Sequence, residues 1–188
     1  ASAIKVNWQG PDSQGDYISI ARPDDEDGYD NYAYTKTGNP LQLNAPSQAG
    51  NWEVRYVLGQ DDVILARKSI EISGVSAEVH PPVEADAASG IAVQWQGPDS
   101  KGDYISIART DDPHGYFNYA YTKAGNPAKL TAPSAAGTFE VRYVLGKDNV
   151  ILARQQIVVK AVTATIQAPA EVEAAAKFKV EWRGPKND

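Results

Sequence analysis

The sequence predicts an all-β protein made of repeated β-sandwich units, and three observations support this prediction. First, the chain repeats itself with an offset of 87 residues: residues 1–73 align with residues 88–160 without a gap, and 51 of the 73 aligned positions are identical. Second, apolar and polar residues alternate in short runs, which is the period of half-buried strands. Third, clusters of Gly, Pro, Asn and Asp separate these runs about every 8 to 12 residues.

The first copy predicts six strands. Ile4, Val6 and Trp8 alternate with polar residues and form the first predicted strand. The others are expected over residues 16–22, 31–36, 41–43, 52–58 and 63–72. The last two form a hairpin through the turn residues 59–62. We find no helical periodicity of useful length, and we interpret the Ala-rich segment Val172–Lys177 as a linker between strands.

A further strand precedes the second copy. It is expected over Ser76–His80, and its counterpart lies at Thr163–Gln167. About seven short strands in a repeat of about 87 residues are typical of an immunoglobulin-like sandwich. We therefore expect repeat 1 over residues 1–73 without its leading strand, repeat 2 over residues 74–160, and the first strands of a truncated repeat 3 over residues 161–188. The short connectors between them predict a semi-rigid rod.

Large aromatic residues are the predicted anchors of the core. Trp8 and Trp95 open the repeated motif, and burial of each removes on the order of 150 to 250 Å² from water. Trp52 and Phe139 occupy the place where such sandwiches carry a tyrosine corner. Neither side chain has a hydroxyl, so the sequence does not predict the usual corner hydrogen bond.

Composition excludes several classes of function. The net charge is −6 and the pI is about 4.9, which is unsuited to a nucleic-acid partner. No apolar run reaches the length of about 18 to 20 residues that crosses a bilayer, and no signal segment opens the chain. The chain contains no Cys, and therefore no disulfide or thiol nucleophile. It also contains no Met, so we expect a mature or excised piece.

The repeated motif resembles a known group of bacterial modules. The run W-x-G-P-x-x-x-x-D-Y-I-x-I is followed by N-Y-A-Y-T-K, G-N-P, A-P, G-x-[WF]-E-V-R-Y-V-L-G and V-I-L-A-R. It resembles the immunoglobulin-like tandem repeats of bacterial envelope proteins that contain a von Willebrand factor A domain. The resemblance implies an extracytoplasmic stalk or adhesion module in the periplasm, on the cell surface or in a secreted protein. It implies no reaction.

The acidic loop at residues 24–30 is the strongest candidate for metal chemistry. Asp24, Asp25, Glu26 and Asp27 crowd hard oxygen ligands next to a Gly, as calcium sites do. The spacing is not that of an EF-hand, and the second copy loses three of the five acids of this loop. A solvated acidic loop without a cofactor is therefore the favoured interpretation, and calcium is kept as a weak alternative.

Tyrosines recur in register and form the strongest candidate for ligand binding. They lie beside Asn31 and Asn118, and the composition is that of paratopes and sugar-binding faces. Period two places the last two tyrosines of each copy on the same face. The favoured interpretation is that they pack onto a sheet or loop within the fold, and ligand binding is the alternative. The candidate ligand-binding residues are Tyr29, Tyr32, Tyr34, Tyr116, Tyr119 and Tyr121.

Other polar residues that recur in both copies have structural interpretations. Asp12 and Asp16, with Asp99 and Asp103, are expected to stabilise the turn between the first two strands. For Arg22, Arg55 and Arg67, cross-strand ion pairs are the favoured role, with ligand recognition as the alternative.

We expect no enzyme, because the two histidines, His80 and His114, are unrelated by the repeat and neither neighbours a nucleophile or metal cluster. The favoured function is a structural stalk or spacer. The first alternative is an adhesion module that binds a protein or polysaccharide through the tyrosines and the acidic loop. The second is self-association through sheet edges, in which strand donation between chains builds a filament.

Overall fold

The computed structural model describes residues 3–184 and confirms the all-β prediction. It divides into two compact units, Ala1–Ser76 with Leu145–Val150, and Ala77–Val144 with Ile151–Asp188. The only helices in the described part of the chain are two short 3-10 turns. No helix among residues 3–184 is long and apolar enough to span a bilayer.

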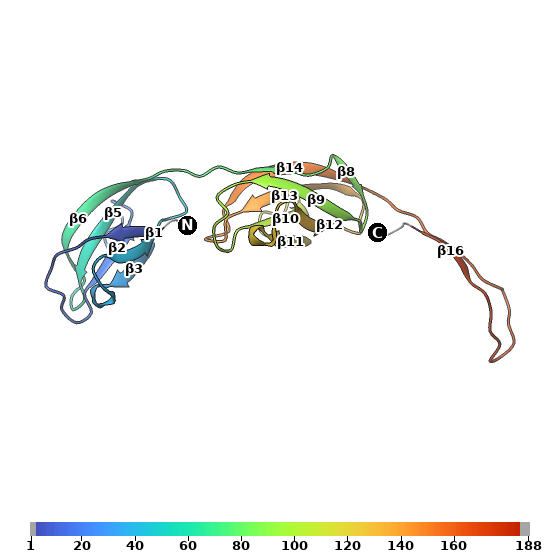
Figure 1. The fold of residues 1–188 in the computed structure, drawn as a ribbon, viewed down its shortest axis with the longest axis horizontal. Helices are drawn as coiled ribbons and strands as arrows, with labels where there is room; N and C mark the ends of the chain where they lie inside the picture. Colours follow the sequence, from blue (N-terminus) through green and yellow to red (C-terminus); the bar gives the residue numbers. More distant parts are fainter. Residues whose placement is uncertain (1–2, 185–188) are drawn as a thin grey trace. The chain divides into compact units, whose positions relative to one another are not determined.

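The first unit consists of two antiparallel sheets (Figure 1). One has the strand order β3-β2-β5-β6, and the other pairs β1 with β4. The elements are β1 (Ala3–Val6), β2 (Tyr17–Ala21), β3 (Asn31–Tyr34), η1 (Thr35–Thr37), β4 (Leu41–Asn44), β5 (Gly50–Leu58) and β6 (Val63–Ile72).

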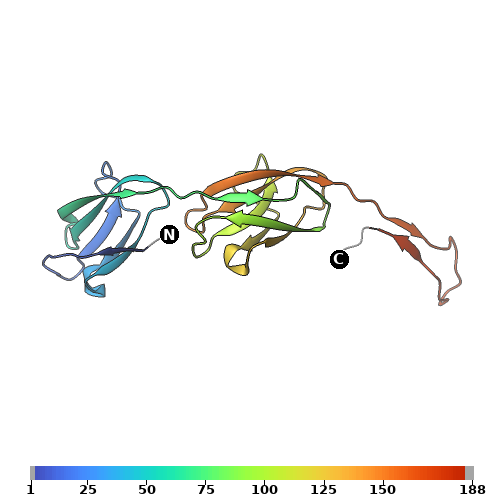
Figure 2. The same cartoon turned by 45° about the horizontal axis from the view of Figure 1, so that its top comes forward.

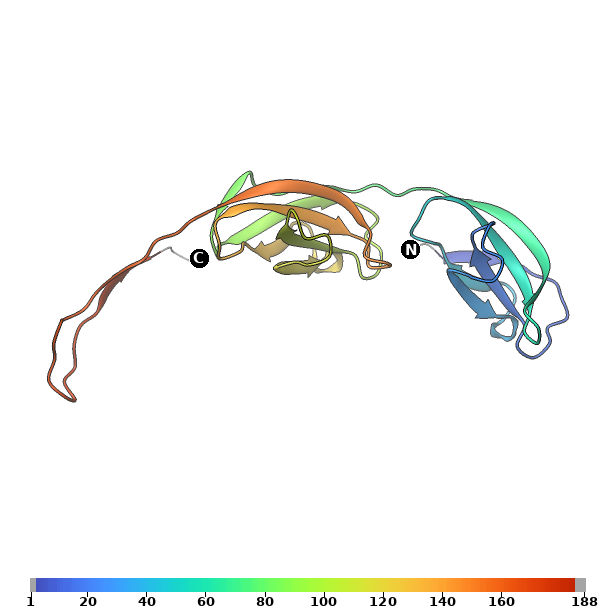
Figure 3. The same ribbon diagram turned by 180° about the vertical axis from the view of Figure 1, so that it is seen from behind.

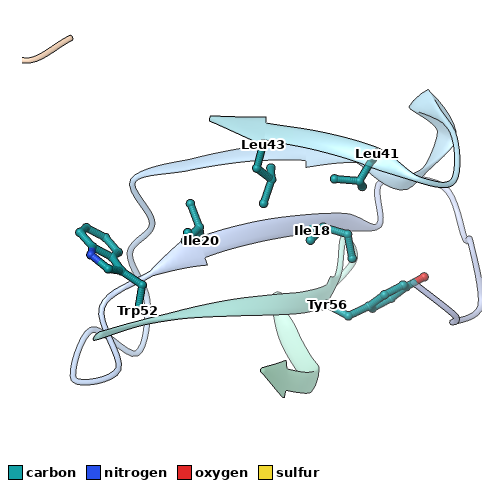
Figure 4. Packing of buried hydrophobic residues seen from close by; sticks show 6 residues of the cluster. All are labelled: Ile18, Ile20, Leu41, Leu43, Trp52 and Tyr56. Atoms are coloured by element: carbon teal, nitrogen blue, oxygen red, sulfur yellow. The ribbon is translucent and has the colours of Figure 1, made fainter. Parts of the chain in front are cut away.

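The core of the first unit lies between these two sheets. Figure 4 shows Leu41 and Leu43 on β4 facing Ile18 and Ile20 on β2, with two aromatic side chains of β5 beside them. These aliphatic side chains are almost fully buried, so each contributes on the order of 1.5 to 3 kcal/mol of transfer free energy. The alternation of buried and exposed residues along β4 follows from the pleat, which turns successive side chains to opposite faces.

The second unit has the same arrangement with additional strands. Its larger sheet has the order β11-β10-β13-β14-β8, in which β13 and β14 run side by side as a long hairpin (Figure 3), and its smaller sheet has the order β12-β9-β7. The elements are β7 (Glu78–His80), β8 (Glu84–Asp86), β9 (Gly90–Gln96), β10 (Tyr104–Arg109), β11 (Asn118–Tyr121), η2 (Thr122–Ala124), β12 (Ala128–Thr131), β13 (Gly137–Val144) and β14 (Ile151–Lys160).

Strand registers recur with the same 87-residue offset as the sequence. In the first unit Tyr17 pairs with Val57, and in the second Tyr104 pairs with Val144. The last hairpin, β15 (Thr165–Gln167) with β16 (Glu181–Arg183), is the red segment of Figure 2. Its register repeats that of β7 with β9. Ile166 lies opposite Trp182 there, as Val79 lies opposite Trp95, but both side chains of the last hairpin are exposed.

The predicted tryptophan anchors are only half-buried. Trp8 packs against the edge of the core, and its indole Nε1 donates a hydrogen bond to the Gly38 carbonyl. Asn39 accepts from the Trp8 backbone N–H and donates to its carbonyl, so the G-N-P motif holds the tryptophan from outside. Trp8 and Trp95 contact the buried rings of Tyr56 and Tyr143 from the edge of the core, with ring centroids 5.9 and 5.8 Å apart, so the prediction that they anchor the core is confirmed only as a peripheral contact. Trp52 of β5 is the buried indole of this unit.

The G-P turn after the first strand is shaped by a close approach of an aromatic ring. In the second unit, a Cβ added at Gly97 would lie 2.5 Å from the Tyr143 ring, and Gly10 stands in the same relation to Tyr56. Real Cβ atoms do not approach so closely. Only glycine therefore lets the turn lie flat on the ring.

The close approach predicts that alanine substitutions at two glycines of the second unit differ widely in their cost in stability. Gly97→Ala is expected to lower the free energy of unfolding by about 1–3 kcal/mol, because either Tyr143 or the turn must move. The control is Gly90→Ala, where nothing lies within 4 Å of an added Cβ, and a change within about 0.5 kcal/mol is expected. Urea denaturation of both variants tests this, and equal effects would contradict it.

Candidate functional site

In each unit a buried aspartate joins the loop before β2, or before its counterpart β10, to the long central strand of the larger sheet. Asp16 precedes β2 and is 2 % exposed. Its Oδ2 accepts hydrogen bonds from Tyr56 Oη at 2.8 Å and from the Ser13 N–H at 2.9 Å, and its Oδ1 accepts from the Gly59 N–H at 3.1 Å. Tyr56 Oη in turn accepts from the Asp12 N–H. We call these contacts the Asp16–Tyr56 lock.

The lock shifts the acid–base equilibria of both side chains. Burial opposes ionisation of Asp16, but the hydrogen bonds from Tyr56, Gly59 and Ser13 outweigh it and hold its pKa below the ordinary value of 3.8. Burial, together with the hydrogen bond to Asp16, raises the pKa of Tyr56. At neutral pH the ionised carboxylate therefore accepts from a protonated phenol.

The second unit repeats the lock with Asp103 and Tyr143. Tyr143 Oη donates to Asp103 Oδ2 at 2.9 Å and accepts from the Asp99 N–H at 2.9 Å. The expectation that the aspartates stabilise the turn is confirmed for Asp16 and Asp103. Trp52 and Phe139 lack the hydroxyl of a tyrosine corner, but Tyr56 and Tyr143, four residues further along the same strands, supply a hydroxyl that bonds to the turn aspartate.

A buried arginine fixes the acidic loop on the opposite face of β5. Arg55 is 2 % exposed, and its guanidinium donates to the carbonyls of Asp25 and Arg22 and to the Glu53 carboxylate. Arg67 on the neighbouring strand also contacts Glu53, at 3.1 Å. The prediction of cross-strand ion pairing is thus confirmed for Arg67, whereas Arg55 pairs along its own strand.

Arg22 has a different role from the predicted ion pair. Its guanidinium carbon lies 3.9 Å from the centroid of the Trp52 ring, and it donates to Gln48 Oε1 and to the Asn51 carbonyl. The prediction was wrong because the Trp52 ring, the loop residue Gln48 and the backbone of β5 at Asn51 satisfy this cation.

In the acidic loop, Asp25 stabilises a turn. Its Oδ1 accepts from the Gly28 N–H at 2.7 Å, and Asp112 makes the equivalent bond to Gly115. Among residues 3–184 no group of three or more acidic or histidine side chains is arranged to hold a metal ion. Calcium at Asp24, Asp25, Glu26 and Asp27 stays an untested prediction.

Four tyrosines gather on the outer face of the larger sheet of the first unit. Tyr17, Tyr29, Tyr32 and Tyr34 contact each other edge to face, with ring centroids 4.9 to 6.0 Å apart. Tyr29, Tyr32 and Tyr34 are 47 %, 41 % and 40 % exposed. They therefore pack onto the outer face of the sheet and onto one another, and each keeps part of its surface open to solvent. We call the four residues the tyrosine cluster.

The tyrosine cluster forms one side of a groove of about 420 Å³. Glu26, Asp27 and Asp62 bring three carboxylates to it. Tyr17 Oη donates to Asp62 at 3.0 Å, and burial together with this bond raises the pKa of Tyr17 to about 12. The hydrogen bond with Tyr34 raises the pKa of Tyr32. These phenols are therefore neutral donors across the physiological pH range.

The second unit carries an equivalent cluster of Tyr104, Tyr116, Tyr119 and Tyr121. Its ring centroids lie 5.0 to 6.1 Å apart. Tyr116, Tyr119 and Tyr121 are also exposed. All six tyrosines selected from the sequence therefore lie at the surface, three in each unit.

The histidines do not join these clusters. His80 lies 3.3 Å from Glu78, with both side chains exposed, and the backbone N–H of His114 donates to Asp112 Oδ1.

Sequence reasoning missed Tyr17, Tyr104, Asp62 and the lock itself. The signal was present in the dipeptides Asp16-Tyr17 and Arg55-Tyr56, because alternation along a strand places the first residue of each pair on one face and the second on the other. In comparisons with known proteins, no protein-family model and no curated protein matched this chain.

The lowered pKa of Asp16 predicts how the stability of the protein changes at acidic pH. A carboxylate whose pKa is depressed on folding stabilises the protein above its unfolded value, and that stability is lost as the pH falls through the folded value. We expect the wild type to lose stability below about pH 4, and the Asp16→Asn variant to be less stable at pH 7 but less dependent on pH below 4. Urea denaturation across this range tests this, and parallel curves would overturn it.

Proposed function

We propose that the chain is a non-enzymatic adhesion module that binds a protein or polysaccharide through its tyrosine clusters. The observation that carries this proposal is the exposure of three large aromatic side chains in each unit, two on a strand and one in the loop before it. Tyrosine is suited to such a surface because its ring supplies rigid contact area and its hydroxyl supplies a hydrogen bond.

Preorganisation supports the proposal. The rings hold each other in edge-to-face contact, Tyr17 is fixed by Asp62, and Arg55 ties down the loop beside them. Less conformational entropy is therefore lost when a ligand binds. The resemblance to envelope-protein repeats supports an extracytoplasmic location, in the periplasm, on the bacterial surface or in a secreted protein.

A second candidate function is that of a structural spacer. The 87-residue repeat without insertions supports it, because the length of an array scales with copy number when each unit has its own core. The two functions are compatible, since a spacer can also display binding faces. Assembly of a filament by strand donation stays a prediction.

Removal of the tyrosine clusters tests the adhesion proposal. Tyr32→Ala with Tyr34→Ala, combined with Tyr119→Ala and Tyr121→Ala, is expected to weaken binding to glycan arrays or to captured proteins by at least about tenfold, because stacking area is lost in both units. Val83→Ala is the control, since Val83 is exposed and lies outside both clusters. Unchanged binding by the fourfold variant would contradict the proposal.

A further inference from the structure

The two repeats share the framework of the groove but differ in its charge. Fourteen residues line the groove of the first unit, and eleven of them are identical at the equivalent positions of the second copy. The three that differ are its three carboxylates: Glu26 is replaced by Pro113, Asp27 by His114 and Asp62 by Asn149. The aromatic residues are kept while the negative charge is removed.

The carboxylates of the first groove are not neutralised by neighbouring cations. Among the residues that the structure describes, no side chain pairs with Glu26 or Asp27, and Asp62 accepts from the neutral Tyr17 hydroxyl. Arg55 also lines the groove, but its guanidinium is buried and donates to the Glu53 carboxylate and to the carbonyls of Asp25 and Arg22 rather than to the groove carboxylates. The open surface of the groove is therefore negative.

The rings provide a second attraction for a cation. The face of an aromatic ring carries negative potential, so it attracts ammonium and guanidinium groups within about 6 Å. The cluster already shows this at one end, where Lys36 Nζ lies 5.3 Å from the centroid of the Tyr34 ring. Tyr17, Tyr29 and Tyr32 share the groove with the three carboxylates.

We infer that the first groove binds an alkylammonium group, with methyl or methylene carbons against the tyrosine rings and the positive charge toward Glu26, Asp27 and Asp62. This inference rests on the proposed function and specifies the ligand of that surface. The second unit has the same rings but lacks these carboxylates. It therefore binds the charged ligand and its uncharged analogue with equal affinity. Ligand charge thus distinguishes the two repeats.

Titration of the whole chain with two small probes tests the inference. Choline carries a trimethylammonium group, and 3,3-dimethylbutan-1-ol has the same shape without the charge. Two-dimensional NMR follows the backbone amides of Gly15, Gly28 and Gly59, which line the first groove. We expect choline to bind there about tenfold more tightly than the alcohol.

Exchanging the charges between the repeats provides matched variants. Glu26→Gln with Asp27→Asn and Asp62→Asn is expected to abolish the preference for choline while leaving the rings in place. Pro113→Glu with His114→Asp and Asn149→Asp is expected to create the preference in the second repeat. All six positions lie outside the core, and circular dichroism checks that both variants fold.

The outcomes separate this inference from the proposed function. If both probes bind the first groove equally, the cation selectivity is overturned and the adhesion surface stands. If neither probe shifts the groove amides and the fourfold tyrosine variant binds its targets like the wild type, both proposals are overturned. Retention of choline selectivity by the neutralised variant also overturns the role of the three carboxylates.

Discussion

The rest of the first unit depends on the Asp16–Tyr56 lock, and the rest of the second unit depends on its counterpart. The lock ties the start of β2 to the end of β5 and holds the loop between β1 and β2, so three separate segments meet at one carboxylate. A buried carboxylate without partners would destabilise the fold, whereas one that accepts three hydrogen bonds stabilises its ionised form. The same chemistry recurs with Asp103 and Tyr143.

The lock connects the core to the outer surface through strand alternation. Asp16 faces inward and Tyr17, the next residue, joins the exposed cluster. On β5, Tyr56 enters the core while Arg55 lies on the opposite face and fixes the acidic loop. Two pairs of adjacent residues thus place Tyr17 at the groove and fix the loop that carries Glu26 and Asp27, which gives this part of the site a rigid foundation.

The fold could be predicted because the repeat and the period-two pattern are explicit in the sequence, and β6 was found with its bounds at Val63 and Ile72. The tyrosines could be selected by type and register. Their exposure could not, because Tyr is equally suited to a half-buried sheet face. The turn role of Asp16 was predicted, but its bond to Tyr56 and the contacts of Arg55 with the acidic loop were not, since residues 30 to 40 positions apart meet through tertiary pairing rather than local pattern.

A double-mutant cycle between Asp16 and Tyr56 tests the central claim most directly. Asp16→Asn, Tyr56→Phe and the double variant are compared by urea denaturation, with Tyr29→Phe as a control for loss of an exposed hydroxyl. If the two groups act as one lock, the second substitution costs far less stability once the first is present. Strictly additive losses, or losses no larger than that of the control, would contradict this account.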